Sequence, residues 1–304
     1  MSASQRDVKN RIGSVKNIQK ITRAMEMVAA ARLRRAEQRI EALRPYAGAI
    51  RRMTRQAAEA AGTEISGLAV LQEHEAENTI ALLLVTGDRG LAGAFNSQII
   101  RAGLRAAREH EEGGRHVLYS AVGRRGVSTL TFRGKDPVGR YVGFTDRPSY
   151  SDAREIAEDL IAAYVDGKAD RVEIFYNGYI SPLSQEVRRE TLLPLQQATI
   201  LEGTERDREG AEDEETGHHA LVEYEPDPEE ILARLIPDYV EISVYRALLE
   251  STASEHGARM TAMRNASENA GELIEDLTLE MNRARQAEIT QEIMEVVAGA
   301  ESLT

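Results

Sequence analysis

Apolar side chains recur every three or four positions along two long stretches, one near each end of the chain. Between residues 238 and 299 there is no proline, only two interior glycines, and many residues that lose little rotamer freedom in a helix. We therefore predict one long helix here, roughly 90 Å in length at about 1.5 Å per residue, projecting from any globular body. Its narrow seam is typical of a helix with one partner helix and follows Ile242, Tyr245, Leu249, Ala253, His256, Met260, Met263, Ser267, Ala270, Ile274, Leu277, Met281 and Ala284.

The first stretch, residues 5–59, predicts a second long helix that ends near Gly62. Pro45 is expected to bend this helix without ending it, because the stripe keeps its phase across it. Two irregular steps, Val15 to Ile18 and Val28 to Leu33, predict a coiled coil with interruptions. The stripe follows Val8, Ile12, Val15, Ile18, Ile21, Met25, Val28, Leu33, Ala36, Ile40, Leu43, Ala47 and Ile50.

Two seams of similar period most simply bury each other as an antiparallel coiled coil. Separate parallel homodimers, one through each helix, are the alternative. Between the helices, residues 79–86 form a continuous apolar run, the pattern of a strand buried on both faces. Further strands are expected at 116–122, 171–176 and 186–193, and helices at 95–110 and 151–165.

The predicted fold class is α/β, a long antiparallel coiled coil of terminal helices with a small, mainly parallel-sheet α/β domain. The predicted organisation is an N-terminal coiled-coil helix at 1–62, an α/β body at 78–201, an acidic loop and connection at 202–226, and a C-terminal coiled-coil helix at 227–304.

Charge is unevenly distributed along the chain. Residues 1–60 carry 14 Lys and Arg against 5 Asp and Glu, whereas residues 202–230 carry 13 acidic against 2 basic residues. A basic coiled coil could bind nucleic acid, but no base-reading motif accompanies it, so a solvated face that meets acidic proteins is the favoured interpretation.

Composition restricts both the chemistry that the chain can carry out and the cellular location expected for it. The chain has no cysteine, which rules out disulfides and thiol chemistry. It has no apolar run near the roughly 20 residues that span a bilayer, and its first residues lack a signal-peptide pattern. A bacterial cytoplasmic location is therefore the default expectation, with a processed organellar protein as the alternative.

The most enzyme-like feature is the turn Gly87-Asp-Arg-Gly-Leu-Ala-Gly93, which follows the first strand. Its GxxGxxG spacing differs from the dinucleotide fingerprint, and it lacks the lysine and hydroxyl of a nucleotide-hydrolysing loop, so a tight turn is favoured over a phosphate site. Glu215 with His218 and His219 lacks a third fixed ligand, so we expect a solvated segment and no metal. His256 falls in the helical seam, where packing between helices is favoured over catalysis.

Three blocks carry a family resemblance: residues 11–30 (RIGSVKNIQKITRAMEMVAA), residues 86–96 (TGDRGLAGAFN), and residues 255–263 with 282–292. Together they resemble the gamma subunit of the rotary F-type ATP synthase, and the likeness covers essentially the whole chain. The acidic segment 203–219 is not part of the common pattern, and its role is left open.

The resemblance implies a non-catalytic central stalk without cofactors, turning inside a ring of alpha and beta subunits at the cytoplasmic face of the bacterial membrane. Its implied partners are that ring, the epsilon subunit and the proton-driven ring of c subunits, with no nucleic acid. It also implies ring contacts at Met25, Arg259, Gln286 and Thr290. The different-class alternative is a nucleotide-binding α/β enzyme with a coiled-coil arm.

Beyond Ala284 the seam changes phase, and a new apolar stripe begins at Ile289, Ile293 and Val296. The first helix is shorter than the last, so these turns are predicted to outrun their partner by roughly 10–30 Å. Exposed apolar side chains on an unpaired helix need to be covered by an apolar surface of another protein. Ile293 and Val296 are therefore added to the predicted ring contacts.

Overall fold

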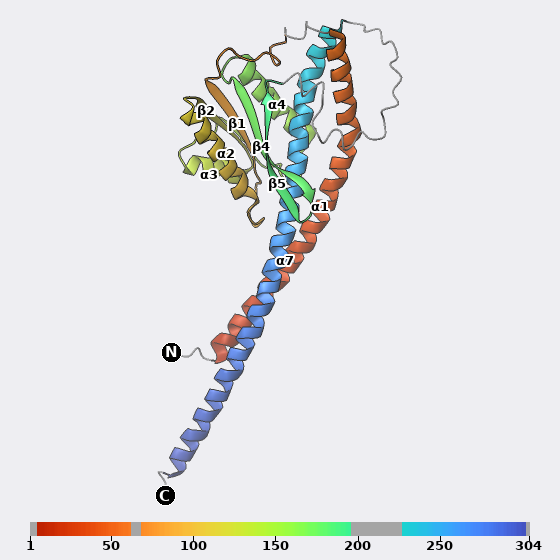
Figure 1. The fold of residues 1–304 in the computed structure, drawn as a ribbon. Helices are drawn as coiled ribbons and strands as arrows, with labels where there is room; N and C mark the ends of the chain where they lie inside the picture. The colour runs from red at the N-terminus through yellow and green to blue at the C-terminus, as the bar shows by residue number, and fades with distance from the viewer. Residues whose placement is uncertain (1–4, 62–67, 196–226, 302–304) are drawn as a thin grey trace. The chain divides into compact units, whose positions relative to one another are not determined.

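The computed structural model describes residues 5–61, 68–195 and 227–301 (Figure 1). Helix α1 spans Gln5–Ala61 and helix α7 spans Pro228–Glu301, with a five-stranded sheet between them in the sequence. The predicted fold class, two long terminal helices with a mainly parallel α/β body, is confirmed. The predicted cap at Gly62 and the whole acidic segment 203–219 lie outside the described residues.

Proline lies inside both long helices. Helix α1 continues through Pro45, as predicted from the unbroken phase of its apolar stripe. Helix α7 also runs through Pro237, so it begins ten residues before the proline-free stretch 238–299 and one residue after the predicted boundary at 227. The turns before this proline bury Leu232 and Ile236 in a cluster that includes residues of α1. This burial offsets the roughly 3 kcal/mol that an internal proline costs a helix.

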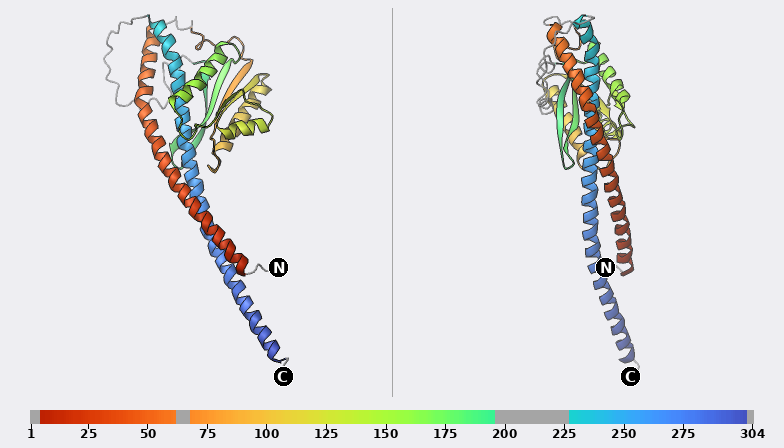
Figure 2. Two further views of the ribbon diagram at one scale, coloured as in Figure 1. Left: turned by 180° about the vertical axis from the view of Figure 1, so that it is seen from behind. Right: turned by 90° about the vertical axis from the view of Figure 1, so that its right-hand side faces the viewer.

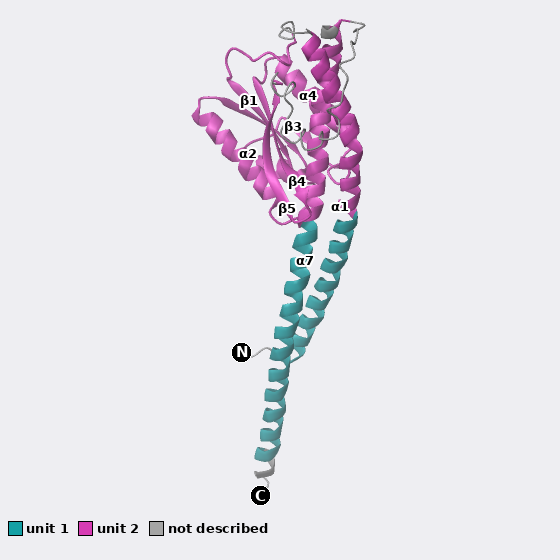
Figure 3. Cartoon of the chain, turned by 45° about the vertical axis from the view of Figure 1, so that its right-hand side comes forward, with its two compact units in different colours: residues 1–31, 259–304 teal, residues 32–258 magenta. Residues whose placement is uncertain are grey.

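The chain divides into two compact units, residues 1–31 with 259–304, and residues 32–258 (Figure 3). Both boundaries fall inside the long helices. In the first unit Val8 and Ile12 of α1 cluster with Leu277 of α7, and further along α1 the Gln19 Nε2 donates to the carbonyl oxygen of Ser267 at 3.3 Å. Residue numbers increase along α1 as they decrease along α7, so the predicted antiparallel pairing is confirmed.

The seam of α1 in this unit differs from the predicted stripe. Ile18, Ile21 and Val28 are exposed, so the predicted interruptions of the heptad are wrong. The seam of α1 instead keeps a strict alternation of four-residue and three-residue steps, because polar side chains occupy some of its positions. One of these, Glu26, pairs with Arg264 at 2.9 Å. The buried and half-buried positions that follow this alternation are Val8, Ile12, Val15, Gln19, Thr22, Glu26 and Ala29.

In the second unit the strands are ordered β3-β2-β1-β4-β5. Strand β1 (Thr79–Val85) pairs in parallel with β2 (His116–Val122) and β4 (Arg171–Ser181), and β2 pairs in parallel with β3 (Gly139–Tyr141). Strand β5 (Ser184–Leu193) is the antiparallel exception and forms a hairpin with β4.

Helices cover both faces of the sheet, as Figure 2 shows. Helices α2 (Phe95–Glu112) and α3 (Arg124–Phe132) pack on one face, where Leu82 and Leu84 are buried. Helix α4 (Tyr150–Val165) and part of α7 pack on the other, with Leu83 and Val85. This double cover explains the continuous apolar run of β1. Helix α3 and the three residues of β3 were not predicted, because elements so short show no clear period.

Helix α7 is buried on more than one stripe in this unit. Val240, Val244 and Leu248 pack against the sheet, while Ile242 packs in the cluster shared with α1. The prediction of a single narrow seam is therefore wrong for this part of the helix, where serine and threonine are buried beside the apolar residues. None of the described helices combines the length and the apolar character needed to span a bilayer.

Candidate functional site

The glycine turn after β1 is the place where an open α/β sheet would bind a ligand. Here the C-terminal helix fills it. The Glu255 side chain, 3% exposed, lies so close to Gly87 that a Cβ at position 87 would come within 2.8 Å of the carboxylate. The amide of Gly87 donates to Asn96 Oδ1 at 2.8 Å. The Glu255 side chain therefore already occupies the space beside the turn where a phosphate would sit.

A second carboxylate closes the same turn. Asp88 accepts hydrogen bonds from the amides of Arg124, Gly143 and Thr145 and from the Thr145 hydroxyl, at 2.9 to 3.2 Å. Burial alone would raise the pKa of Asp88, but these backbone donors outweigh it and hold the pKa below its ordinary value. The turn thus holds an ionised side chain that pairs with amide groups of the loops after β2 and β3.

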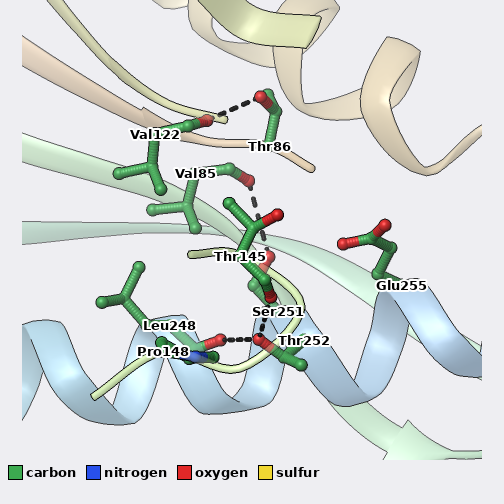
Figure 4. Close-up of a pocket in the computed structure, with 9 residues that line it drawn as sticks. All are labelled: Val85, Thr86, Val122, Thr145, Pro148, Leu248, Ser251, Thr252 and Glu255. Atoms are coloured by element: carbon green, nitrogen blue, oxygen red, sulfur yellow. Dashed lines mark hydrogen bonds between the residues drawn. The ribbon is translucent and has the colours of Figure 1, made fainter. Parts of the chain in front are cut away.

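Hydroxyl groups of α7 meet the end of β1 and the loop after β3 beside this turn (Figure 4). Thr252 Oγ1 donates to the Thr145 carbonyl at 2.9 Å, and Ser251 Oγ lies 3.5 Å from the carbonyl oxygen of Val85. The cavity they line has a volume of about 10 Å³, the space of a single water. The turn therefore serves as a seat for α7, and it leaves no room there for a nucleotide.

His256 is buried, with its Nε2 3.7 Å from Asp146. Asp146 follows β3 and also pairs with Arg32 of α1. His256 thus joins a helix to a loop. Among the described residues no group of His, Asp and Glu could hold a metal ion, and the candidates Glu215, His218 and His219 lie outside them.

The six predicted contact residues differ in accessibility. Gln286, Thr290, Ile293 and Val296 are exposed on the last turns of α7, where Thr290 Oγ1 donates to the Gln286 carbonyl at 2.8 Å. At about 100° per residue the first three share one face of the helix. Met25 is half-buried on α1, and Arg259 is only 8% exposed.

Sequence reasoning missed an exposed apolar stripe on α1, formed by Ile18, Ile21 and Val28, each between 52% and 59% exposed. At about 100° per residue this stripe lies roughly 100° around the helix from the buried seam. Strict heptad counting from Val8 would have found it, because that count places Gln19, Thr22 and Glu26 on the seam and leaves the isoleucines outside.

Comparison with known proteins points to one family. The sequence model of the family described as ATP synthase matches residues 4–303. The ATP synthase gamma chains of Rubrobacter xylanophilus and Moorella thermoacetica are each 44% identical over 301 residues, covering 99% of this chain and 99% of theirs.

Solved structures agree. A chain of the Tetrahymena thermophila mitochondrial ATP synthase, from a structure of its central stalk and c-ring, is 28% identical with a TM-score of 0.57, covering 81% of this chain and 99% of that one. A chain of the Euglena gracilis mitochondrial enzyme shares the fold with a TM-score of 0.64, at 19% identity over 98% of this chain and 94% of its own. With full-length relatives at 44% identity, this chain belongs to the gamma-chain family of the F-type ATP synthase.

Proposed function

We propose that this chain is the central stalk of an F-type ATP synthase, a rotor shaft that couples proton-driven rotation of a membrane ring to the nucleotide sites of an alpha–beta ring. The observation that carries the proposal is the bare apolar end of α7. Ile289, Ile293, Val296 and Val297 are between 48% and 73% exposed.

These residues have no partner helix among the described residues of their unit. The cluster at the start of α1 contains Val8 with Leu277 and Met281 of α7, and every side chain from Arg285 to Ala298 is exposed. The stretch from Met281 to Val297 extends about 24 Å at about 1.5 Å per residue. A lone helix with exposed isoleucine and valine is unstable and adhesive in water, so it needs an apolar sleeve from other subunits.

The exposed stripe on α1 supplies a second surface of the same kind. Ile18, Ile21 and Val28 flank Met25, the residue that the family resemblance assigns to the ring. Because the heptad seam is already filled on the adjacent face, these side chains are free to meet another protein. Met25, Arg259, Gln286, Thr290, Ile293 and Val296 are accordingly proposed as contacts with the alpha–beta ring.

The chain itself is proposed to catalyse nothing. Glu255 fills the space beside the turn where a nucleotide-binding α/β enzyme would hold phosphate, and the ionised Asp88 in that turn disfavours an anionic ligand. This geometry weighs against the enzyme alternative. The nucleotide sites would belong to other chains of the assembly.

The proposal extends to the other partners and to the location. Relatives are described within assemblies that contain F1 and a c-ring, so we infer contacts with the c subunits and with epsilon, at the cytoplasmic face of the bacterial membrane as a peripheral subunit. The test is purification of the tagged chain from cells that also carry the other subunits of its ATP synthase. Alpha, beta and epsilon should accompany it in fixed proportion, and a chain that purifies alone with bound nucleotide would overturn the proposal.

A further inference from the structure

The β4–β5 hairpin reaches past the parallel part of the sheet. The last residue pair between β1 and β4 joins Leu84 to Phe175, whereas β4 continues to Ser181. At about 3.3 Å per residue the additional residues carry the hairpin roughly 20 Å beyond that pair. The hairpin therefore ends in a tip formed by residues 180–185, Ile-Ser-Pro-Leu-Ser-Gln.

This tip is apolar, exposed and free of charge. Leu183 is 72% exposed and Ile180 is 55% exposed. Residues 176–185 contain no charged side chain, although 29% of the whole chain is charged. A single exposed leucine is ordinary on a protein surface. Two large apolar residues within four positions, in a charge-free run, instead match the composition at the centre of a protein–protein interface.

Both long helices hold the hairpin in place. The Tyr179 hydroxyl donates to Glu37 of α1, and Ser254 Oγ of α7 donates to the Asn177 carbonyl at 3.1 Å. Pro182 packs so closely on Gly257 of α7 that a Cβ at Gly257 would come within 2.9 Å of the Pro182 carbonyl oxygen. A surface fixed in this way loses little conformational entropy when it binds.

We propose that Ile180 and Leu183 form a further contact surface for apolar side chains of the alpha–beta ring. The inference rests on the proposed function. Gly257, which seats the tip, precedes Arg259 by two residues in the same helix, so the tip continues the series of proposed ring contacts along α7. Its lack of basic side chains disfavours an anionic lipid surface, which attracts lysine and arginine.

The experiment places a photo-crosslinking residue, p-benzoylphenylalanine, at one position at a time in the full chain reconstituted with its own alpha, beta, epsilon and c subunits. Leu183 is the test position. Ile293 reports on the proposed function, and Phe132, 90% exposed at the end of α3, is the matched control on the β3 side of the sheet. We expect crosslinks to alpha or beta from Leu183 and Ile293, and none from Phe132.

Each other result is decisive. If Ile293 crosslinks to the ring while Leu183 gives no more product than Phe132, the hairpin inference is wrong and the rotor function stands. A Leu183 crosslink to epsilon, a c subunit or lipid also overturns the inference. If neither Leu183 nor Ile293 gives a crosslink, both the hairpin inference and the proposed function are overturned. As a second measurement, Leu183→Asp with Ile180→Asp should weaken binding to the alpha–beta ring about tenfold or more, with the thermal unfolding of the isolated chain unchanged because both side chains are exposed.

Discussion

The carboxylate of Glu255 in the C-terminal helix lies against Gly87 in the turn that follows the first strand, with 2.8 Å between it and the position a Cβ would take. A turn whose sequence resembles a phosphate-binding loop therefore packs against a helix. Asp88, one residue further on, accepts hydrogen bonds from the amides of Arg124, Gly143 and Thr145, which ties the turn to the loops after β2 and β3.

The first prediction concerns nucleotide binding. The isolated chain should neither bind ATP tightly nor hydrolyse it, because two carboxylates occupy the turn and the lysine and hydroxyl of nucleotide-hydrolysing loops are missing. Titration calorimetry with ATP and magnesium checks this. Micromolar affinity that disappears in Gly90→Val or Gly93→Val would contradict the account.

The second prediction uses the depressed pKa of Asp88. A carboxylate with a folded-state pKa below its ordinary value near 3.8 contributes stability above that value and loses it as the pH falls through the folded-state pKa. Asp88→Asn should therefore be less stable than wild type at pH 7, and the difference should shrink below about pH 4.

Urea unfolding at a series of pH values measures this effect. Asp166→Asn is the matched control, because Asp166 is 54% exposed and pairs with the exposed Lys168; it should change stability little at any pH. An Asp88→Asn difference that does not vary between pH 3 and pH 7 would show that the backbone amides do not stabilise the ionised form.

The third prediction compares one substitution at two glycines. In α2, a Cβ at Gly103 would come within 2.3 Å of Leu84, so Gly103→Ala should destabilise the chain by about 1–3 kcal/mol through overpacking. In α1, nothing lies within 4 Å of a Cβ at Gly13, so Gly13→Ala should stabilise the helix by up to about 1 kcal/mol. Chemical denaturation of the two variants should give opposite signs, and equal signs would refute the close packing of α2 on β1.

The fourth prediction concerns the acidic segment. Deletion of residues 204–219 should leave folding and assembly intact, because alanine is its only apolar residue type and it can bury little apolar area. Thermal unfolding and co-purification with the alpha–beta ring measure both. A loss of several degrees in the unfolding temperature would show that the segment has a structural role.

The fifth prediction tests the bare end of α7. Ile293→Asp with Val296→Asp should weaken assembly with the ring or uncouple hydrolysis from proton pumping, because charge replaces apolar contact. The unfolding of the isolated chain should be unchanged, since both side chains are exposed. Glu292→Gln with Glu295→Gln is the matched control on exposed neighbours. Normal coupling in the aspartate variant would contradict a bearing at this end.

Much of the fold could be predicted from periodicity. The continuous run at β1 predicted a buried strand, and the three-and-four spacing predicted two paired helices that tolerate Pro45. The passage of α7 through Pro237 has no such local signal, because the burial of Leu232 and Ile236 is a tertiary effect that outweighs the local cost of the proline.

The functional surfaces could be predicted less well from the sequence. Hydrophobicity alone placed Ile18 and Ile21 in the seam, whereas the helix pairs through Gln19, Thr22 and Glu26 and leaves the isoleucines exposed. The seating of α7 in the glycine turn depends on Glu255, which lies 168 residues from Gly87 in the sequence. Local pattern carries no signal for a contact at that separation.

The most direct test of the rotor account is single-molecule rotation. Since the chain has no cysteine, one cysteine at the exposed Val165 can carry a probe while the alpha–beta ring is fixed to a surface. The account predicts that the probe turns in one direction while ATP is hydrolysed and stops when ATP is removed. A probe that stays fixed on a ring that is hydrolysing ATP would contradict it.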